Sequence, residues 1–171
     1  MESKIIWFTG LSGSGKTTLS NYILKKLKNK KFKVKKIDGD IFRKKNRAAK
    51  FNKTSIINNN ISIINYIDKI RLRYDFILVS VISPLKKTRI LAHKKFKNKY
   101  FEVYTKCNLK ELINRDTKKL YEKAKKNIIK DLIGFNSSIN YEMTNYKKIV
   151  VNTARETIKV SANKIMNKIY L

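Results

Sequence analysis

The stretch of sequence that decides the fold reads Gly10-Leu11-Ser12-Gly13-Ser14-Gly15-Lys16-Thr17-Thr18. It matches the pattern G-x-x-x-x-G-K-[ST] at every specified position. The residues before it, 4–9, are an apolar run with β-branched and aromatic side chains, which indicates a buried strand. After it, apolar residues recur at helical spacing, at Leu19, Tyr22, Ile23 and Leu27. A strand before the loop and a helix after it are the setting in which this pattern binds phosphate.

The chemistry of the loop follows from its residue types. Glycines let the main chain curl so that successive N–H groups point at the phosphates, and the following helix adds its positive end. Lys16 is expected to reach the β- and γ-phosphates of ATP, and Thr17 to offer its hydroxyl to Mg²⁺. We therefore predict that residues 10–18 bind ATP, with Mg²⁺ as the cofactor.

Two carboxylates, Asp38 and Asp40, follow the next predicted strand, residues 32–37. Gly39 between them is expected to allow a tight turn, and a plain Asx turn is the alternative interpretation. In a parallel sheet this strand end faces the same crevice as the phosphate loop. Asp40 is the candidate that takes the proton of an acceptor hydroxyl, with Asp38 in support. Arg43 is either a clamp for an acceptor phosphate or an exposed surface arginine.

The rest of the chain continues the alternation of strands and helices. We expect strands at 76–82, 100–104 and 149–151, and helices at 56–72, from Pro84, at 109–126 and from Ile158. This order predicts an α/β fold with a mostly parallel five-stranded sheet, helices on both faces and a helical lid. A length of 171 residues fits one domain, 1–171.

The composition is strongly basic, with a formal net charge of +29. Lysines are scattered through nearly every segment beside abundant Asn and Ile, whereas proteins that read nucleic-acid grooves favour arginine. We expect small nucleotides as partners and no nucleic-acid polymer, although an RNA-binding P-loop NTPase remains an alternative. No run approaches a membrane span and the N-terminus lacks a signal sequence, so a cytoplasmic protein without membrane contact is expected. The oligomeric state stays open between a monomer and a homodimer.

Several motifs resemble, in chain order, those of the adenylyl-sulfate kinase family of P-loop kinases. Residues 38–43 (DGDIFR) resemble the family's D-G-D-N-I-R, and residues 82–84 (ISP) are followed by Arg89, as in the family. Residues 115–121 (RDTKKLY) resemble its lid segment R-D-P-K-G-L-Y. Tyr141-Glu142 and residues 151–153 (VNT) match the stretches before and at the last strand. The family phosphorylates the ribose 3′-hydroxyl of adenylyl sulfate with Mg-ATP.

The resemblance implies roles for individual residues. Asp40 and Lys16 would be catalytic, Arg115 and Thr153 would join the loop in binding ATP, and a lid at approximately 115–140 would close over the phosphates. Such a lid would exclude water and stabilise the transferring charge. The acceptor would be bound by Asp38, Asp40, Arg43, Phe51, Asn59, Ile82, Ser83, Lys118 and Leu120, with Phe51 stacking on the base.

The acceptor side departs from the family pattern. Where the family shows F-S-x-x-D-R-x-x-N-I-R, residues 51–61 read FNKTSIINNNI, so Ser55 and Ile56 replace Asp and Arg. The counterpart of the family's Asn is either Asn59 or Asn60. Because the ATP-side motifs are intact, we favour a changed acceptor, cytidine diphosphoramidate, in capsule biosynthesis. The alternatives are a genuine adenylyl-sulfate kinase and a homologue without activity.

Overall fold

A computed structural model of the protein describes residues 2–45 and 52–170. Its centre is a five-stranded sheet in the order β2-β3-β1-β4-β5, and every neighbouring pair of strands is parallel. The α/β fold expected from the sequence is therefore confirmed. The strands are β1 (Lys4–Thr9), β2 (Val34–Asp38), β3 (Phe76–Ser80), β4 (Tyr100–Lys106) and β5 (Ile149–Asn152).

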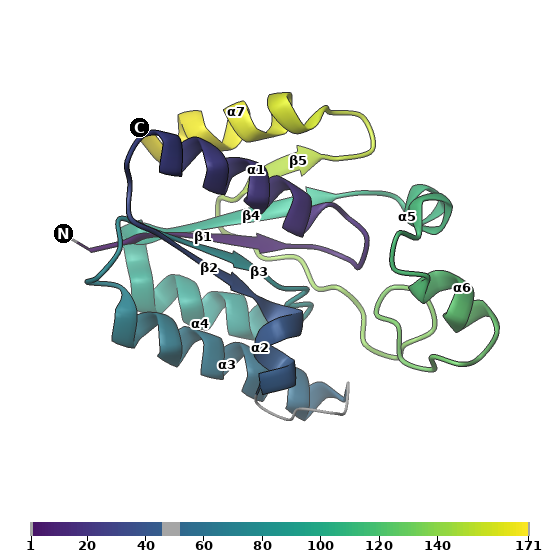
Figure 1. The fold of residues 1–171 in the computed structure, drawn as a ribbon. Coiled ribbons are helices and arrows are strands. Elements are labelled where there is room, and N and C mark those ends of the chain that lie inside the picture. The colour runs from purple at the N-terminus through teal and green to yellow at the C-terminus, as the bar shows by residue number, and fades with distance from the viewer. Residues whose placement is uncertain (1, 46–51, 171) are drawn as a thin grey trace.

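Helices cover both faces of the sheet (Figure 1). One face carries α1 (Lys16–Asn29) and α7 (Ile158–Tyr170), and the other carries α3 (Lys53–Ile70) and α4 (Lys86–Phe96). The short helix α2 (Gly39–Lys45) follows β2, and a 3-10 turn (Lys97–Lys99) leads into β4. Two further short helices, α5 (Leu109–Arg115) and α6 (Leu120–Lys125), lie beyond the carboxyl ends of the strands.

The core consists of two apolar layers, one on each side of the sheet. Alternate residues of β1 point to opposite layers, Ile5 and Trp7 to the α3/α4 side, and Ile6 and Phe8 to the α1/α7 side. All four side chains are almost completely buried. A central parallel strand buried on both faces has this continuous apolar sequence, which is why residues 4–9 identify a strand so clearly.

The register of the strands brings their carboxyl ends to one edge. Asp38 on β2 and Phe8 on β1 both lie opposite Ser80, the last residue of β3. The phosphate loop after β1, the acidic segment after β2 and residues 81–83 after β3 therefore leave the sheet at the same level. On the other side, Lys106 at the end of β4 lies opposite Asn152 on β5.

Two expectations about helices and one about a turn were wrong in detail. The segment 109–126 is not one helix, because Asp116 ends α5 and its carboxylate then accepts the N–H groups of Leu120, Tyr121 and Glu122, which begin α6. The helix expected from Pro84 begins only at Lys86. Gly39 does not form a tight turn but begins α2.

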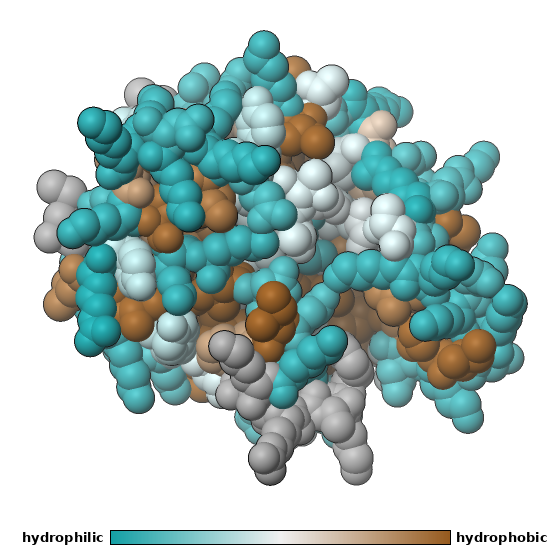
Figure 2. Space-filling view, in the orientation of Figure 1, coloured by the Kyte–Doolittle hydropathy of each residue, from teal (hydrophilic) through white to brown (hydrophobic). Residues whose placement is uncertain are grey.

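Hydrophilic side chains cover most of the face in Figure 2, and hydrophobic residues reach this surface only in separate small groups. This agrees with a positive charge distributed over the whole chain. Within residues 2–45 and 52–170, no helix combines the length and apolarity that a bilayer span requires.

Candidate active site

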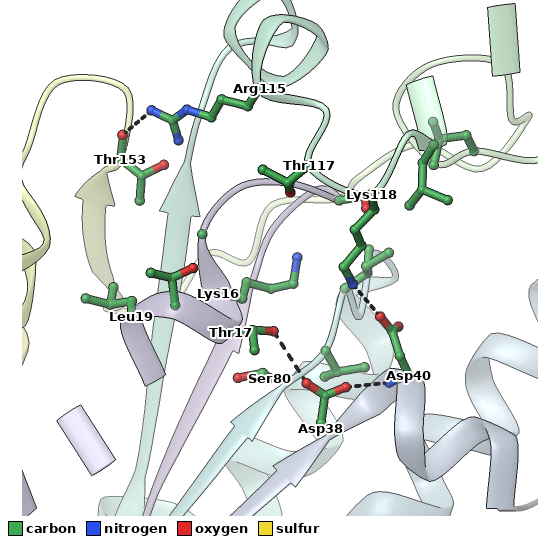
Figure 3. A pocket seen from close by; sticks show the side chains of 18 of the residues that line it. Lys16, Thr17, Leu19, Asp38, Asp40, Ser80, Arg115, Thr117, Lys118 and Thr153 are labelled. Atoms are coloured by element: carbon green, nitrogen blue, oxygen red, sulfur yellow. Dashed lines mark hydrogen bonds and ion pairs between the residues drawn. The ribbon is translucent and has the colours of Figure 1, made fainter. Parts of the chain in front are cut away.

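A cavity of about 1200 Å³ opens at the carboxyl edge of the sheet. Residues from the phosphate loop, from the end of β2, from the segment after β3, from the α5–α6 region and from the segment after β5 line it together (Figure 3). Drug-sized ligand sites span roughly 300–1,000 Å³, so this cavity has room for more than one small molecule. Its position agrees with the rule that ligands bind outside the carboxyl ends of parallel strands.

The phosphate loop is packed closely against β4. Gly10 has φ +140°, and a Cβ atom there would lie 2.5 Å from Thr105 Oγ1, so only glycine fits. The Ser14 hydroxyl lies 2.7 Å from the same Thr105 Oγ1 atom. Among the nine loop residues, all but Gly10, Leu11 and Ser14 line the cavity.

The Lys16 amine lies within its own loop, donating to the carbonyl oxygens of Gly10 (2.9 Å) and Leu11 (2.7 Å). Burial lowers the pKa of this amine to about 7; the Asp40 carboxylate opposes the shift, Lys118 adds to it, and Asp38 opposes it. Both carboxylates therefore lie close enough to act on the charge of Lys16.

Asp38 and Asp40 have different contacts at the end of β2. Asp38 Oδ1 accepts from the main-chain N–H of Asp40 (3.0 Å) and Ile41 (3.4 Å), which begins α2. Its other oxygen, Oδ2, accepts from the Thr17 hydroxyl at 3.4 Å. Asp40 is thereby held at the start of the helix with its carboxylate directed into the cavity (Figure 3).

Gly39 is required here because of a close approach. A Cβ atom on Gly39 would lie 2.6 Å from Val81 Cγ2. The glycine thus lets the start of α2 pack against the segment after β3, and this contact replaces the turn that the sequence suggested.

The α5–α6 region reaches across the cavity at two points. Lys118 Nζ lies 2.7 Å from Asp40 Oδ2, and the Tyr121 hydroxyl donates to the Ser12 carbonyl at 3.0 Å. Thr117, Lys118 and Leu120 line the cavity from this side, together with Ile129, Asp131 and Leu132. The predicted lid segment therefore contacts both the phosphate loop and the acidic strand end.

Arg115 and Thr153 come together on the opposite side of the phosphate loop. Arg115 Nη2 donates to the Thr153 carbonyl at 2.7 Å, and its Nε atom pairs with Glu111 at 2.8 Å. The Thr153 hydroxyl donates to the Ser14 carbonyl at 3.1 Å. This links the end of α5, the segment after β5 and the loop in one corner of the cavity.

A second, smaller cavity of about 20 Å³ adjoins Asp40 and Arg43. It holds the predicted acceptor residues Asn59, Ile82 and Ser83, and Asn60 as well. Both asparagines are at least 95% buried, and in the part of the chain that the structure describes their Oδ1 atoms have no hydrogen-bond partner. Unsatisfied buried carbonyl oxygens are costly unless a ligand supplies a donor. Phe51 lies outside the described residues.

Sequence reasoning missed several residues of the larger cavity. Ser80 and Val81 lie at the end of β3, and Glu156, Ile158 and Ser161 follow β5. The only available signal was position, because Ser80 and Val81 lie near the end of the strand predicted at 76–82 and the other three residues follow the strand predicted at 149–151. Their residue types carry no phosphate-binding pattern, so nothing else distinguished them.

Comparisons with known proteins agree with this geometry. The family model described as adenylylsulphate kinase matches residues 2–152. The adenylyl-sulfate kinase of Halothermothrix orenii is 35% identical over 163 residues, which cover 94% of this chain and 86% of that protein. The probable adenylyl-sulfate kinase of Pyrococcus abyssi is 36% identical, covering 98% of this chain and 95% of that one.

Among solved structures, the Mycobacterium tuberculosis APS kinase CysC in complex with AMPPNP and APS superposes with a TM-score of 0.91. It is 28% identical, and the match covers 99% of both chains.

Proposed function

The chain belongs to the adenylyl-sulfate kinase family, and from this premise we propose that it transfers the γ-phosphoryl group of ATP to the ribose 3′-hydroxyl of adenylyl sulfate. As a member of the family it is an ATP-dependent kinase that phosphorylates a nucleotide hydroxyl group. The observation that carries the proposal is one cavity lined both by the phosphate loop with Lys16 and by Asp40, whose carboxylate acts on the charge of Lys16. The chain thus supplies a phosphate cradle and a carboxylate base to the same space.

The transfer follows from these positions. The Asp40 carboxylate takes the proton of the 3′-hydroxyl while the hydroxyl oxygen forms a bond to the γ-phosphorus. The bond from the γ-phosphorus to the oxygen that bridges it to the β-phosphate breaks, and ADP leaves with that oxygen. Lys16 turns from the Gly10 and Leu11 carbonyls to the β- and γ-phosphates, whose negative charge keeps its amine protonated.

Lys118 adds a second positive charge at the point of transfer. In the structure it pairs with Asp40 Oδ2, and opening this ion pair would make the carboxylate a better base for the acceptor proton. A lysine released at that moment lies beside the transferring phosphoryl group, where a cation stabilises the developing charge. Closure of the lid segment over the cavity would in this way be coupled to the transfer of the acceptor proton to Asp40.

The residues present suit a magnesium ion. The Thr17 hydroxyl and the Asp38 carboxylate lie 3.4 Å apart and both line the cavity, and oxygen atoms of this kind are the ligands that Mg²⁺ prefers. Thr17 would bind the ion directly and Asp38 would hold one of its waters. When bound, Mg²⁺ neutralises charge on the β- and γ-phosphates.

The acceptor base would lie in the part of the larger cavity that adjoins the smaller one, because about 20 Å³ holds only about one water molecule and the two cavities share Asp40, Arg43 and Ile82. The Oδ1 atoms of Asn59 and Asn60, which have no partner within residues 2–45 and 52–170, can accept hydrogen bonds from an exocyclic amino group, which both adenine and cytosine carry. Ile82 and Ser83 form the wall beside them. Adenylyl sulfate supplies such a base together with the 5′-anhydride that the basic residues of the cavity would bind.

One observation favours a second candidate acceptor, cytidine diphosphoramidate. Ser55 and Ile56 stand where the family pattern has Asp and Arg, and Ile56 is 3% exposed in an apolar cluster with Leu85 and Ile133. Ser55 accepts a hydrogen bond from Arg43 Nη1 at 3.1 Å. An apolar side chain therefore stands where the family pattern has a cation, and the loss of that charge-assisted contact to a bound anion favours a changed acceptor. A role in capsule biosynthesis would follow from this acceptor.

A coupled assay of ADP release decides between the two acceptors. The protein is supplied with Mg-ATP and either adenylyl sulfate or cytidine diphosphoramidate at matched concentrations, and kcat/KM is compared. Turnover with adenylyl sulfate at least about tenfold more efficient supports the first proposal, and the reverse ratio supports the second. If neither acceptor stimulates ADP release above the rate with water alone, both proposals fail.

A further inference from the structure

A buried ion pair lies behind the wall of the smaller cavity, outside the machinery described above. Arg89 on α4 is completely buried, and its Nε atom lies 3.4 Å from Oε2 of Glu102 on β4, whose side chain is 1% exposed. Removing two charges from water is costly, and replacing such a pair with apolar residues is often neutral or stabilising. Stability alone therefore gives a weak reason for its presence.

The guanidinium of Arg89 joins two main-chain segments. Nη1 donates to the carbonyl of Ser83, and Nη2 donates to the carbonyl of Glu142. The ring of Tyr141 covers one face of the guanidinium, with its centroid 4.7 Å away. A planar fork with several fixed donors can hold two carbonyls in this way, whereas a single ammonium cannot match the geometry.

Ser83 is in a conformation that needs support. Its φ is +45°, a region that is unfavourable for a residue with a side chain unless the surroundings hold it. Ser83 lines the smaller cavity beside Asn59 and Asp40, so its main-chain direction sets the shape of the proposed acceptor site. The hydrogen bond from Arg89 acts on the carbonyl of this same residue.

Tyr141 and Glu142 hold the residues on either side of Ser83. The Tyr141 hydroxyl lies 2.9 Å from the hydroxyl of Thr9, which itself donates to the Ile82 carbonyl at 2.5 Å. The main-chain N–H of Glu142 donates to the Pro84 carbonyl at 2.9 Å. Residues 82–84 are thus held on both sides of Ser83, and the Arg89 guanidinium lies at the centre of these contacts.

Glu102 orients the guanidinium. Its carboxylate accepts hydrogen bonds from Thr144 Oγ1 at 3.1 Å and from the Tyr146 hydroxyl. Two residues of the segment that follows Glu142 therefore fix the Glu102 carboxylate. The ion pair with this carboxylate then sets the position of Arg89.

We propose that Arg89, oriented by Glu102, is a positioning residue for the acceptor, because it fixes the main chain of Ser83 in the wall of the smaller cavity. This inference rests on the proposed function of the acceptor site that adjoins that cavity. Arg89 contacts no substrate; it acts through the Ser83 carbonyl.

Arg89→Lys tests the proposal, since lysine keeps the charge beside Glu102 but loses the fork. We expect the KM for the acceptor to rise about tenfold or more, with the Kd for ATP within about twofold of the unaltered protein. Arg71→Lys is the matched control, because Arg71 pairs with Glu2 and Asp68 on the surface. Equal losses in acceptor and ATP binding, or no change in either, would overturn the proposal.

A double-mutant cycle tests whether Arg89 acts through Ser83. Glycine adopts positive φ without strain, so Ser83→Gly in the Arg89→Lys background should restore part of the lost acceptor affinity, and the combined loss should be smaller than the sum of the single losses. Additive losses would show that the two residues act independently. If Arg89→Lys does not fold, Tyr141→Phe is measured instead, because it removes one support of residues 82–84. It should raise the acceptor KM while leaving the Kd for ATP unchanged. An unchanged acceptor KM contradicts the proposal.

Hydrogen exchange gives a readout that needs no acceptor. Arg89→Lys should speed amide exchange at residues 81–85 and 141–146 but not at the phosphate loop, and equal acceleration at both places would indicate a merely structural role. If the unaltered protein turns over neither acceptor, the proposed function fails, while the exchange pattern still decides whether Arg89 holds this wall.

Discussion

Lys118 Nζ lies 2.7 Å from Asp40 Oδ2, although 78 residues separate them in the chain. Both side chains remain more than half exposed, so the ion pair contributes little to stability. Its importance is geometric, because it joins the segment between α5 and α6 to the carboxylate that faces the phosphate loop (Figure 3). The first two predictions concern this pair.

Replacing Lys118 with alanine should reduce kcat by about 100-fold, because a cation near the transferring phosphoryl group is lost from a site where such contacts matter most. The Kd for ATP should change little. Lys123→Ala is the matched control, an exposed lysine of α6 outside the cavity. Steady-state kinetics with both acceptors measure the effect, and a kcat equal to that of the control would remove Lys118 from the transfer step.

Replacing Asp40 with asparagine should lower kcat by about 10²–10⁴-fold with a small change in the acceptor KM, because the amide keeps the shape but cannot take a proton. Asp68→Asn serves as the control, since Asp68 lies in surface ion pairs with Arg71 and Lys95. An unchanged kcat in single-turnover measurements would exclude Asp40 as the base.

At about pH 8, the protein should take up a proton at Lys16 when it binds ATP. Burial lowers the pKa of Lys16 to about 7 in the free protein, so its amine is largely neutral there, and the triphosphate then favours the ammonium form. ATP affinity should therefore weaken as the pH rises above about 7. Calorimetry in buffers of different ionisation enthalpy measures the uptake directly. Lys16→Arg should abolish the uptake, because arginine stays protonated; uptake that persists in this variant would assign it elsewhere.

Asn59→Leu should raise the acceptor KM by about tenfold while kcat/KM for ATP stays near its original value, because a buried acceptor of hydrogen bonds is removed from the smaller cavity. Asn60→Leu is measured beside it, although its amide also donates to the Ile56 carbonyl at 2.8 Å. Asn58→Leu is the matched control, an exposed asparagine on the same helix. An equal rise in the acceptor KM for Asn58→Leu and Asn59→Leu would argue against recognition of the base by Asn59.

Gly39→Ala should lower the melting temperature, although alanine usually stabilises a helix relative to glycine. The reason is the approach of 2.6 Å between the added Cβ and Val81 Cγ2. Val81→Ala should relieve the clash, so the double variant should lose less stability than the two single variants together. Thermal unfolding followed by circular dichroism measures this, and a stabilised Gly39→Ala would contradict the packing argument.

Local patterns predicted most of the fold. The residues of β1 alternate between two apolar layers, and the loop after it matches a complete phosphate-binding pattern, so both could be assigned from short stretches. The break between α5 and α6 could not, because it depends on one carboxylate, Asp116, turning back to accept three main-chain N–H groups. The lid movement, the cytoplasmic location, the single-domain boundary and the oligomeric state stay predictions.

The sequence by itself determined the parallel sheet, the phosphate loop and the placing of Asp38 and Asp40 at a strand end, because each depends on neighbours in the chain. Tertiary structure alone decided that Lys118 meets Asp40, that Arg89 holds the Ser83 carbonyl, and that the Oδ1 atoms of Asn59 and Asn60 find no hydrogen-bond partner among the described residues. These contacts arise where distant segments pack together, and the energy that fixes them comes from strand register and burial, which no short stretch of sequence records.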